Sequence, residues 1–128
     1  MLRLDASNRS PLRTYLISRA VIWALAVVTV VFFSDRLNPI RGTWDSARLH
    51  ELGDVIDVWA RWDSDWYVRI AEGWYEWPSA TPAFFPLYPA AVGALGRVFA
   101  GHYVLAGVAI SLVAGSAAAV LVHRLARR

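Results

Sequence analysis

The stretch LRTYLISRAVIWALAVVTVVFF, residues 12–33, decides the class of fold. Beyond Arg13 it holds a single charge, Arg19, and as a helix it is about 33 Å long, enough to cross the hydrocarbon core of a bilayer. A second stretch, YVLAGVAISLVAGSAAAVLV at residues 103–122, carries no charge and is about 30 Å long as a helix. The sequence therefore predicts an all-α membrane protein with a transmembrane helix near each end.

Residues 12–33 also fit a secretory signal peptide in length. No pair of small residues ends the apolar run, which closes in Phe-Phe-Ser-Asp at 32–35, so an uncleaved helix is favoured. Three basic residues, Arg3, Arg9 and Arg13, lie at the start of the chain. The positive-inside rule then predicts a cytoplasmic N-terminus with residues 34–82 outside. Arg19, about two turns in, is expected to snorkel to the near interface or to pair inside a bundle.

The composition of the 128 residues excludes several classes of protein. Hydrophobic residues make up 57%, above the 45–50% usual for soluble domains, and the length corresponds to a single domain. The absence of cysteine excludes a disulfide-rich secreted module. All 13 basic residues are scattered arginines and the net charge is only +3, which argues against nucleic-acid binding.

Residues 34–82 differ from both ends of the chain, because they hold nine acids, five arginines and six of the seven tryptophans. We expect short amphipathic helices on the outer membrane interface here. Thr43 is expected to cap a helix that runs to about Leu52 and stops at Gly53. A second helix, Asp65–Glu72, would be capped by Asp63 and Ser64, ended by Gly73 and supported by an Asp65–Arg69 pair. The pair Asp54 and Asp57 is expected on a solvated face.

Residues 84–100 are apolar but contain two prolines, two glycines and Arg97. A helix from Pro86 to Ala100 would be about 22 Å long, so this segment is either a short, tilted membrane span or a re-entrant element. The C-terminal arginines favour a cytoplasmic end and an even number of spans, whereas counting 84–100 as a span gives three and places that end outside.

Small residues recur every four positions in the last helix, at Gly107, Ser111, Gly115 and Ala119. Such a stripe lets another helix approach closely. We expect it to contact other transmembrane helices, and in this chain it has no evident partner.

The most informative residues are RWDSDWYVRIAEGWY at 61–75, followed by AFFPLYP at 83–89. The carboxylate of Asp63, flanked by Trp62 and Trp66 at a membrane surface, suits general-base chemistry. Aromatic faces suit sugar rings, and Arg61 with Arg69 suits a phosphate group. On local grounds a helix cap is the favoured interpretation of Asp63, and the two roles are compatible. The three histidines lie far apart in sequence, so no metal site is predicted from them.

These two blocks, in this order behind one N-terminal span, resemble the first outer loop of PIG-V-type mannosyltransferases. Those are polytopic enzymes of the GT-C fold that take mannose from a polyprenyl-phosphate donor, and their eukaryotic members act in GPI-anchor synthesis. The resemblance implies that Asp63 is the catalytic base. It also implies that the residues around Asp63 bind substrate, namely Arg61, Trp62, Asp65, Trp66, Tyr67, Arg69, Phe84, Phe85, Pro86 and Tyr88.

The resemblance further implies about three spans, an integral location in a plasma membrane of bacterial type, and a lipid-linked sugar donor. Family members are several times longer, so we expect an N-terminal part of such an enzyme that is inactive alone. Whether a divalent metal takes part is left open, although Asp63 and Asp65 would share one if they faced together. The alternative, from the helix stripe, is a small non-catalytic membrane protein that packs against a larger partner.

Overall fold

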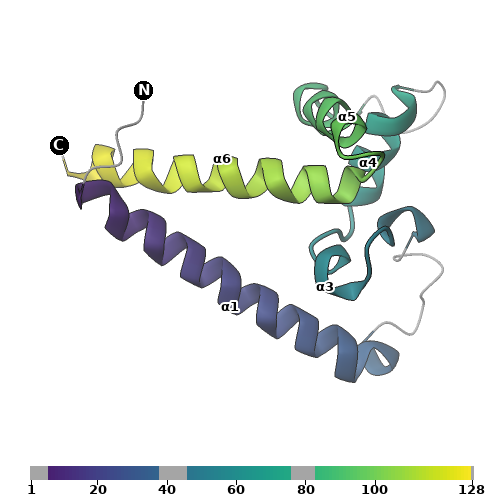
Figure 1. Ribbon diagram of the computed structural model, residues 1–128, viewed down its shortest axis with the longest axis horizontal. Coiled ribbons are helices and arrows are strands. Elements are labelled where there is room, and N and C mark those ends of the chain that lie inside the picture. Colours follow the sequence, from purple (N-terminus) through teal and green to yellow (C-terminus); the bar gives the residue numbers. More distant parts are fainter. Residues whose placement is uncertain (1–5, 38–45, 76–82, 128) are drawn as a thin grey trace.

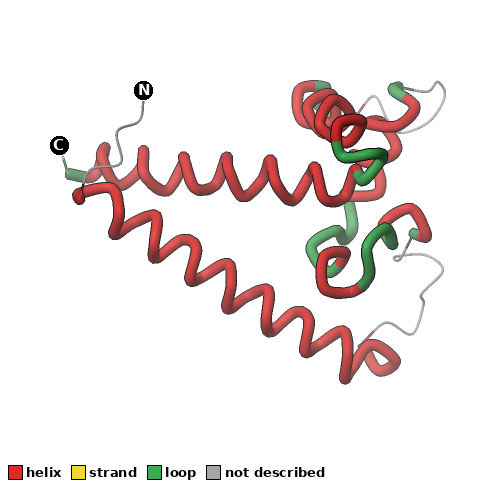
Figure 2. The backbone as a smooth tube through the Cα atoms, viewed as in Figure 1, coloured by secondary structure: helices red, strands yellow, loops and turns green. Residues whose placement is uncertain are grey.

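Two long helices, α1 (Ala6–Leu37) and α6 (Tyr103–Ala126), form the frame of the computed structural model. The structure describes residues 6–37, 46–75 and 83–127. The two helices meet where α1 begins and α6 ends, and they diverge toward the other end (Figure 1). The shorter elements lie around the diverging ends, namely η1 (Ala47–Leu49), α3 (Asp54–Asp57), α4 (Ser64–Gly73) and α5 (Leu87–Val98). The described residues form only helices and loops (Figure 2).

Both long helices are long and apolar enough to cross a membrane. No residue from Ser10 to Phe33 is buried, and large apolar side chains such as Leu25 (63% exposed) and Phe32 (73%) cover α1 on all sides. Apolar side chains all round a helix that its own chain does not bury are typical of a membrane span. The prediction of an all-α chain is confirmed in the described residues, and a candidate membrane-spanning helix lies near each end.

The expectation of about three spans is met by two helices only. Residues 84–100 form α5 (Leu87–Val98), which begins directly after Pro86 and is about 18 Å long. That length is well short of a bilayer core. Helix α5 packs against α4 and the first part of α6, at the end of the molecule opposite the start of α1 and the end of α6 (Figure 1).

The segment between the long helices is folded on α6. Helix α4 (Ser64–Gly73) agrees closely with the predicted helix Asp65–Glu72, and it buries Val68, Ile70 and Ala71. Two small cores result, and both join α4 to the start of α6. One contains Leu49, Ala60, Val68 and Val104, and the other contains Ala71, Val92 and Ala106.

The prediction of a helix that runs from Thr43 to about Leu52 is wrong for the described residues 46–52. Its proposed cap, Thr43, lies outside the described residues. Instead a single 3-10 turn, η1 (Ala47–Leu49), follows Ser46, whose Oγ accepts a hydrogen bond from the Arg48 backbone N–H. The next residues are diverted by Asp57, whose carboxylate accepts the backbone N–H of Leu52 and Gly53 at 3.0 and 2.7 Å. Asp57 is 1% exposed, so its expected place on a solvated face is also wrong.

Helix α3 (Asp54–Asp57) begins after Gly53, whose φ of 88° and ψ of 166° are open to glycine almost alone. This short helix holds α1 in place, because the Trp23 indole N–H donates to the Val55 carbonyl at 2.6 Å. It therefore ties the polar middle of the chain to the first long helix.

The stripe of small residues on α6 packs within the chain. A side chain at Gly107 would meet the Tyr88 hydroxyl at 3.1 Å, and one at Gly115 would overlap the Tyr15 ring. The Ser111 hydroxyl is hydrogen-bonded to the Tyr88 hydroxyl at 3.1 Å. The expectation that this face has no partner in the chain is therefore wrong, since tyrosines from α1 and α5 lie on it.

Candidate functional site

The two sequence blocks 61–75 and 83–89 come together through aromatic side chains. Phe84 stacks on Trp66 with ring centroids 5.9 Å apart, and Tyr67 meets both Phe84 and Tyr88 edge-on at 5.1 and 5.0 Å. The Tyr75 hydroxyl donates to the Phe84 carbonyl at 2.7 Å. Contacts of this type favour a fixed arrangement of the two blocks.

A hollow opens beside this cluster, at the turn that precedes α4. Its lining consists of Arg61, Trp62, Asp63, Ser64, Tyr67 and Tyr88, and its volume is about 370 Å³. Each block thus contributes to one concave surface, and five of the six lining residues come from the first block. The hollow contains Asp63, the residue predicted to be the catalytic base.

Asp63 directly precedes α4, as predicted for a cap, but its side chain makes no capping hydrogen bond. The Asp63 carbonyl instead accepts the Tyr67 backbone N–H at 3.2 Å. Ser64 makes the local side-chain bond, since its Oγ accepts the Arg61 backbone N–H at 3.1 Å. The Asp63 side chain is therefore exposed beside the hollow and is not used to cap the helix.

Trp62, next to Asp63, has a backbone φ of 49° and a side chain that is 73% exposed. A bulky residue with positive φ is strained, and such strain is concentrated at functional sites. Burial does not account for the strain, because Trp62 is 73% exposed. An indole held open beside a carboxylate is suited to stacking on a ligand.

The other predicted site residues have different surroundings. Asp65 lies 3.7 Å from the Arg48 guanidinium, which also pairs with Glu72, so it does not share the hollow with Asp63. Arg69 lies over the Trp66 ring, 5.7 Å from its centroid. Phe85 is 77% exposed and Pro86 directly precedes α5, and both lie outside the hollow lining.

Within the described residues, no group of three or more His, Asp or Glu is placed to hold a metal.

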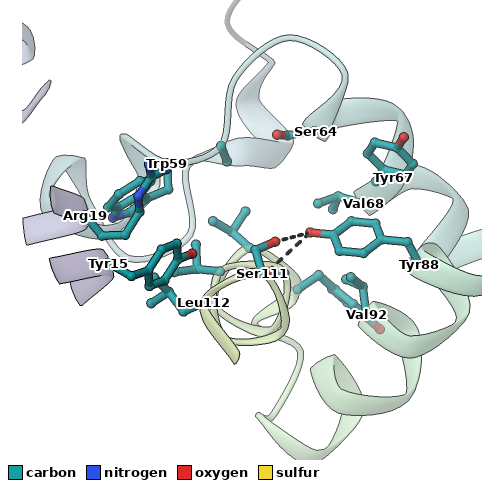
Figure 3. A pocket seen from close by; sticks show the side chains of 15 residues that line it. Tyr15, Arg19, Trp59, Ser64, Tyr67, Val68, Tyr88, Val92, Ser111 and Leu112 are labelled. Carbon is teal, nitrogen blue, oxygen red and sulfur yellow. Dashed lines mark hydrogen bonds between the residues drawn. The ribbon is translucent and has the colours of Figure 1, made fainter. Parts of the chain in front are cut away.

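A second and deeper cavity of about 290 Å³ lies between α1, α6 and the folded middle segment. Ser64, Tyr67 and Tyr88 line both this cavity and the hollow, so the two spaces share a wall. Figure 3 shows Tyr88 and Tyr67 on one side of the cavity and Tyr15 and Arg19 on the other. The Tyr88 hydroxyl also bonds the Gly107 carbonyl at 3.2 Å, which fixes the shared wall to α6.

Sequence reasoning missed this cavity. Its lining comes from four distant parts of the chain, and only Arg19, a charge within an apolar stretch, signalled it in the sequence. Arg19 does not lie in a carboxylate pair in the described residues, and its guanidinium sits over the Tyr15 ring at 5.3 Å.

Comparisons of the chain with protein-family models, with curated proteins and with solved structures found no significant match.

Proposed function

We propose that this chain carries the outer-loop catalytic region of an integral membrane glycosyltransferase. Its reaction would be mannosyl transfer from polyprenyl-phosphate-mannose to an acceptor hydroxyl at the outer membrane face. The observation that carries the proposal is the meeting of blocks 61–75 and 83–89 around a hollow that contains an uncommitted carboxylate, Asp63. The double motif itself supplies the link to the PIG-V-type enzymes.

In this proposal Asp63 removes the proton of the acceptor hydroxyl as that oxygen attacks the anomeric carbon of the sugar. The bond from the anomeric carbon to the phosphate oxygen breaks, and the polyprenyl phosphate leaves with the electron pair. Trp62 and Tyr67, which line the hollow, offer aromatic faces to a sugar ring. Arg61, in the same lining, supplies positive charge near the leaving phosphate.

The membrane arrangement that supports the proposal is a hairpin of α1 and α6. The start of α1 and the end of α6 lie at the same end of the molecule (Figure 1), so a cytoplasmic location of that end would satisfy the positive-inside rule for both helices. Helix α5 would lie on the outer side with α4, as the re-entrant or interfacial alternative for 84–100. The catalytic hollow would face outward, where a lipid-linked donor presents its sugar.

The test is Asp63→Asn, made in a full-length homologous enzyme that has transfer activity with polyprenyl-phosphate-mannose. Loss of a general base lowers turnover by about 10²- to 10⁴-fold, so a loss in this range is expected. Asp65→Asn is the matched control, since Asp65 contacts Arg48 rather than the hollow, and it should retain most of the activity. Full activity of Asp63→Asn, or equal losses in both variants, would refute the role of Asp63.

The alternative, a non-catalytic protein that packs on a larger partner through the α6 stripe, has less support. Gly107, Ser111 and Gly115 already contact tyrosines of the same chain. A partner helix on that face would have to displace Tyr15 and Tyr88.

A further inference from the structure

Arg19 is the charge that lies deepest in the candidate span of α1. It is about 14 Å along the helix from Ser10, the first residue of that span, and it lines the cavity between α1 and α6. Its guanidinium lies over the Tyr15 ring, and its Nε is buried without a hydrogen bond to any described residue. A cation at this depth is costly unless it is paired, and such residues face the interior of a helix bundle or a cavity.

The carboxylates of the middle segment that are not fully exposed have other partners. Glu51 accepts the first two N–H groups of α6, and Asp57 accepts two backbone N–H groups of its own loop. Asp65 lies 3.7 Å from the Arg48 guanidinium. The cavity lining, as far as the structure describes it, contains no acidic residue. These parts of the chain therefore supply no counter-charge for Arg19.

A second copy of the chain does not supply the anion at this depth either. Neither candidate span, Ser10–Phe33 or Tyr103–Ala126, holds an aspartate or a glutamate. The carboxylate that complements Arg19 within a membrane therefore belongs to a helix of another sequence.

The surroundings of the cavity leave room for such a helix. No residue of the candidate span of α1 is buried by the chain, and beyond Ser111, which lines the cavity, α6 exposes Ala114 and Ala118. Small residues at such positions let a second helix approach closely. The cavity volume of about 290 Å³ is too small for a turn of helix about 10 Å wide. It can admit a single side chain that projects from a helix packed outside it.

We propose that Arg19 pairs with an aspartate or glutamate on a transmembrane helix of another sequence, which packs beside α1 and α6 and projects that side chain into the cavity. A guanidinium and a carboxylate form two parallel hydrogen bonds, so the pair fixes the depth of the partner helix as well as its charge. This pairing concerns assembly within the membrane, and it does not depend on the proposed reaction.

The test is a double-mutant cycle in vesicles of neutral phosphatidylcholine. The probe is a synthetic transmembrane peptide of about 20 alternating Leu and Ala residues with one Glu at its centre, and its twin carries Gln there. Energy transfer from a donor on the peptide to an acceptor on Ala126→Cys, in the otherwise cysteine-free full chain, measures binding. Arg19→Gln is compared with Arg13→Gln, which removes an exposed arginine from the same helix.

We expect the parent chain to bind the Glu peptide at least about tenfold more tightly than the Gln peptide, as for other charged hydrogen bonds. Arg13→Gln should keep this preference, and Arg19→Gln should abolish it. If Arg19→Gln does not fold, Arg19→Lys replaces it. Lysine retains the charge without the paired geometry, so a reduced preference for the Glu peptide should remain.

Equal affinity of the parent chain for the two peptides would overturn the proposal, and so would a Glu preference that survives in Arg19→Gln or vanishes in Arg19→Lys. Energy transfer between donor-labelled and acceptor-labelled chains that requires Arg19 would assign this face to a second copy instead. Loss of the Glu preference in vesicles that contain phosphatidylglycerol would show that an anionic lipid, rather than a helix, pairs with Arg19.

Discussion

At the scale of single residues, the turn at 61–64 combines strain with an open carboxylate. Trp62 holds a positive φ without burying its indole, and Asp63 precedes a helix without capping it. A stable turn would use a glycine at the first position and a side-chain cap at the second. Both departures leave a functional group exposed in the same hollow, and this coincidence supports a binding role for the turn.

The strain at Trp62 can be measured by comparing Trp62→Gly with Trp62→Ala. Both remove an indole that is 73% exposed, so they lose similar packing. A left-handed backbone costs an L-residue about 1–2 kcal/mol, so the glycine variant should be more stable than the alanine variant by about 1 kcal/mol after its greater unfolded-state entropy is counted. Thermal unfolding in detergent, followed by circular dichroism, measures the difference. An alanine variant as stable as the glycine variant would show that the turn carries no strain.

At the scale of elements, the start of α6 depends on a residue far away in sequence. The helix begins after His102, which provides no side-chain cap, and the Glu51 carboxylate accepts the N–H groups of Tyr103 and Val104 at 2.9 and 3.0 Å. The first N–H groups of a helix have no partner within it, and a carboxylate there also interacts favourably with the helix dipole. Glu51 therefore fixes the polar segment to the end of α6.

Replacing Glu51 by Gln should loosen this junction. The amide retains one acceptor oxygen but loses the charge, and we expect a loss of about 1–2 kcal/mol, between the values for a helix-dipole interaction and a charged hydrogen bond. Hydrogen exchange should then rise at Tyr103 and Val104 before it rises in the middle of α6. Asp54→Asn is the matched control, because Asp54 is an exposed carboxylate at the start of α3. Equal exchange in both variants would contradict the role of Glu51.

A second element-scale prediction concerns the contact of α4 with α5. A Cβ at Gly93 would lie 2.8 Å from the Ala71 carbonyl oxygen, which is backbone and cannot rotate away. Gly93→Ala should therefore destabilise the chain by about 1–3 kcal/mol through overpacking, despite the better helix propensity of alanine. Ala94→Val, which adds volume at an exposed position of the same helix, should cost far less in the same thermal unfolding experiment. A stabilised Gly93→Ala would show that α4 and α5 are further apart.

Prediction from the sequence succeeded where neighbouring residues alone determine an element. Apolar length predicted α1 and α6, the Asp-Ser pair and Gly73 bounded α4, and Pro86 marked the start of α5. It failed where a distant residue decides the outcome. The buried Asp57 binds the backbone at 52–53, after a segment that was predicted to be helical up to Leu52 and is not, and the tyrosines on the α6 stripe come from α1 and α5. The motif indicated Asp63, but not the cavity around Arg19, which exists only after α1 and α6 pack together.

At the scale of the whole molecule, the decisive feature is that the start of α1 and the end of α6 lie at one end, whereas α4 and α5 lie at the other (Figure 1). The hollow lies at the turn before α4. A bilayer that contains α1 and α6 would place both charged ends on one side and α4 with α5 on the other. A three-span arrangement would require α5 to leave its contacts with α4 and α6 and to cross a core that its length of about 18 Å does not match.

The absence of cysteine makes this topology directly measurable, because single cysteines can be introduced without a background. Ser10→Cys and Ala126→Cys mark the start of α1 and the end of α6, which we expect on the cytoplasmic side. Ala83→Cys precedes α5, and all three positions are exposed. With intact cells and a membrane-impermeant maleimide, Ala83→Cys should react, whereas the other two should react only after lysis. Labelling of Ala126→Cys in intact cells would mean that residues 84–100 cross the bilayer, as the family resemblance implied. Protection of Ala83→Cys would place the Asp63 hollow inside the cell and would exclude transfer at the outer face.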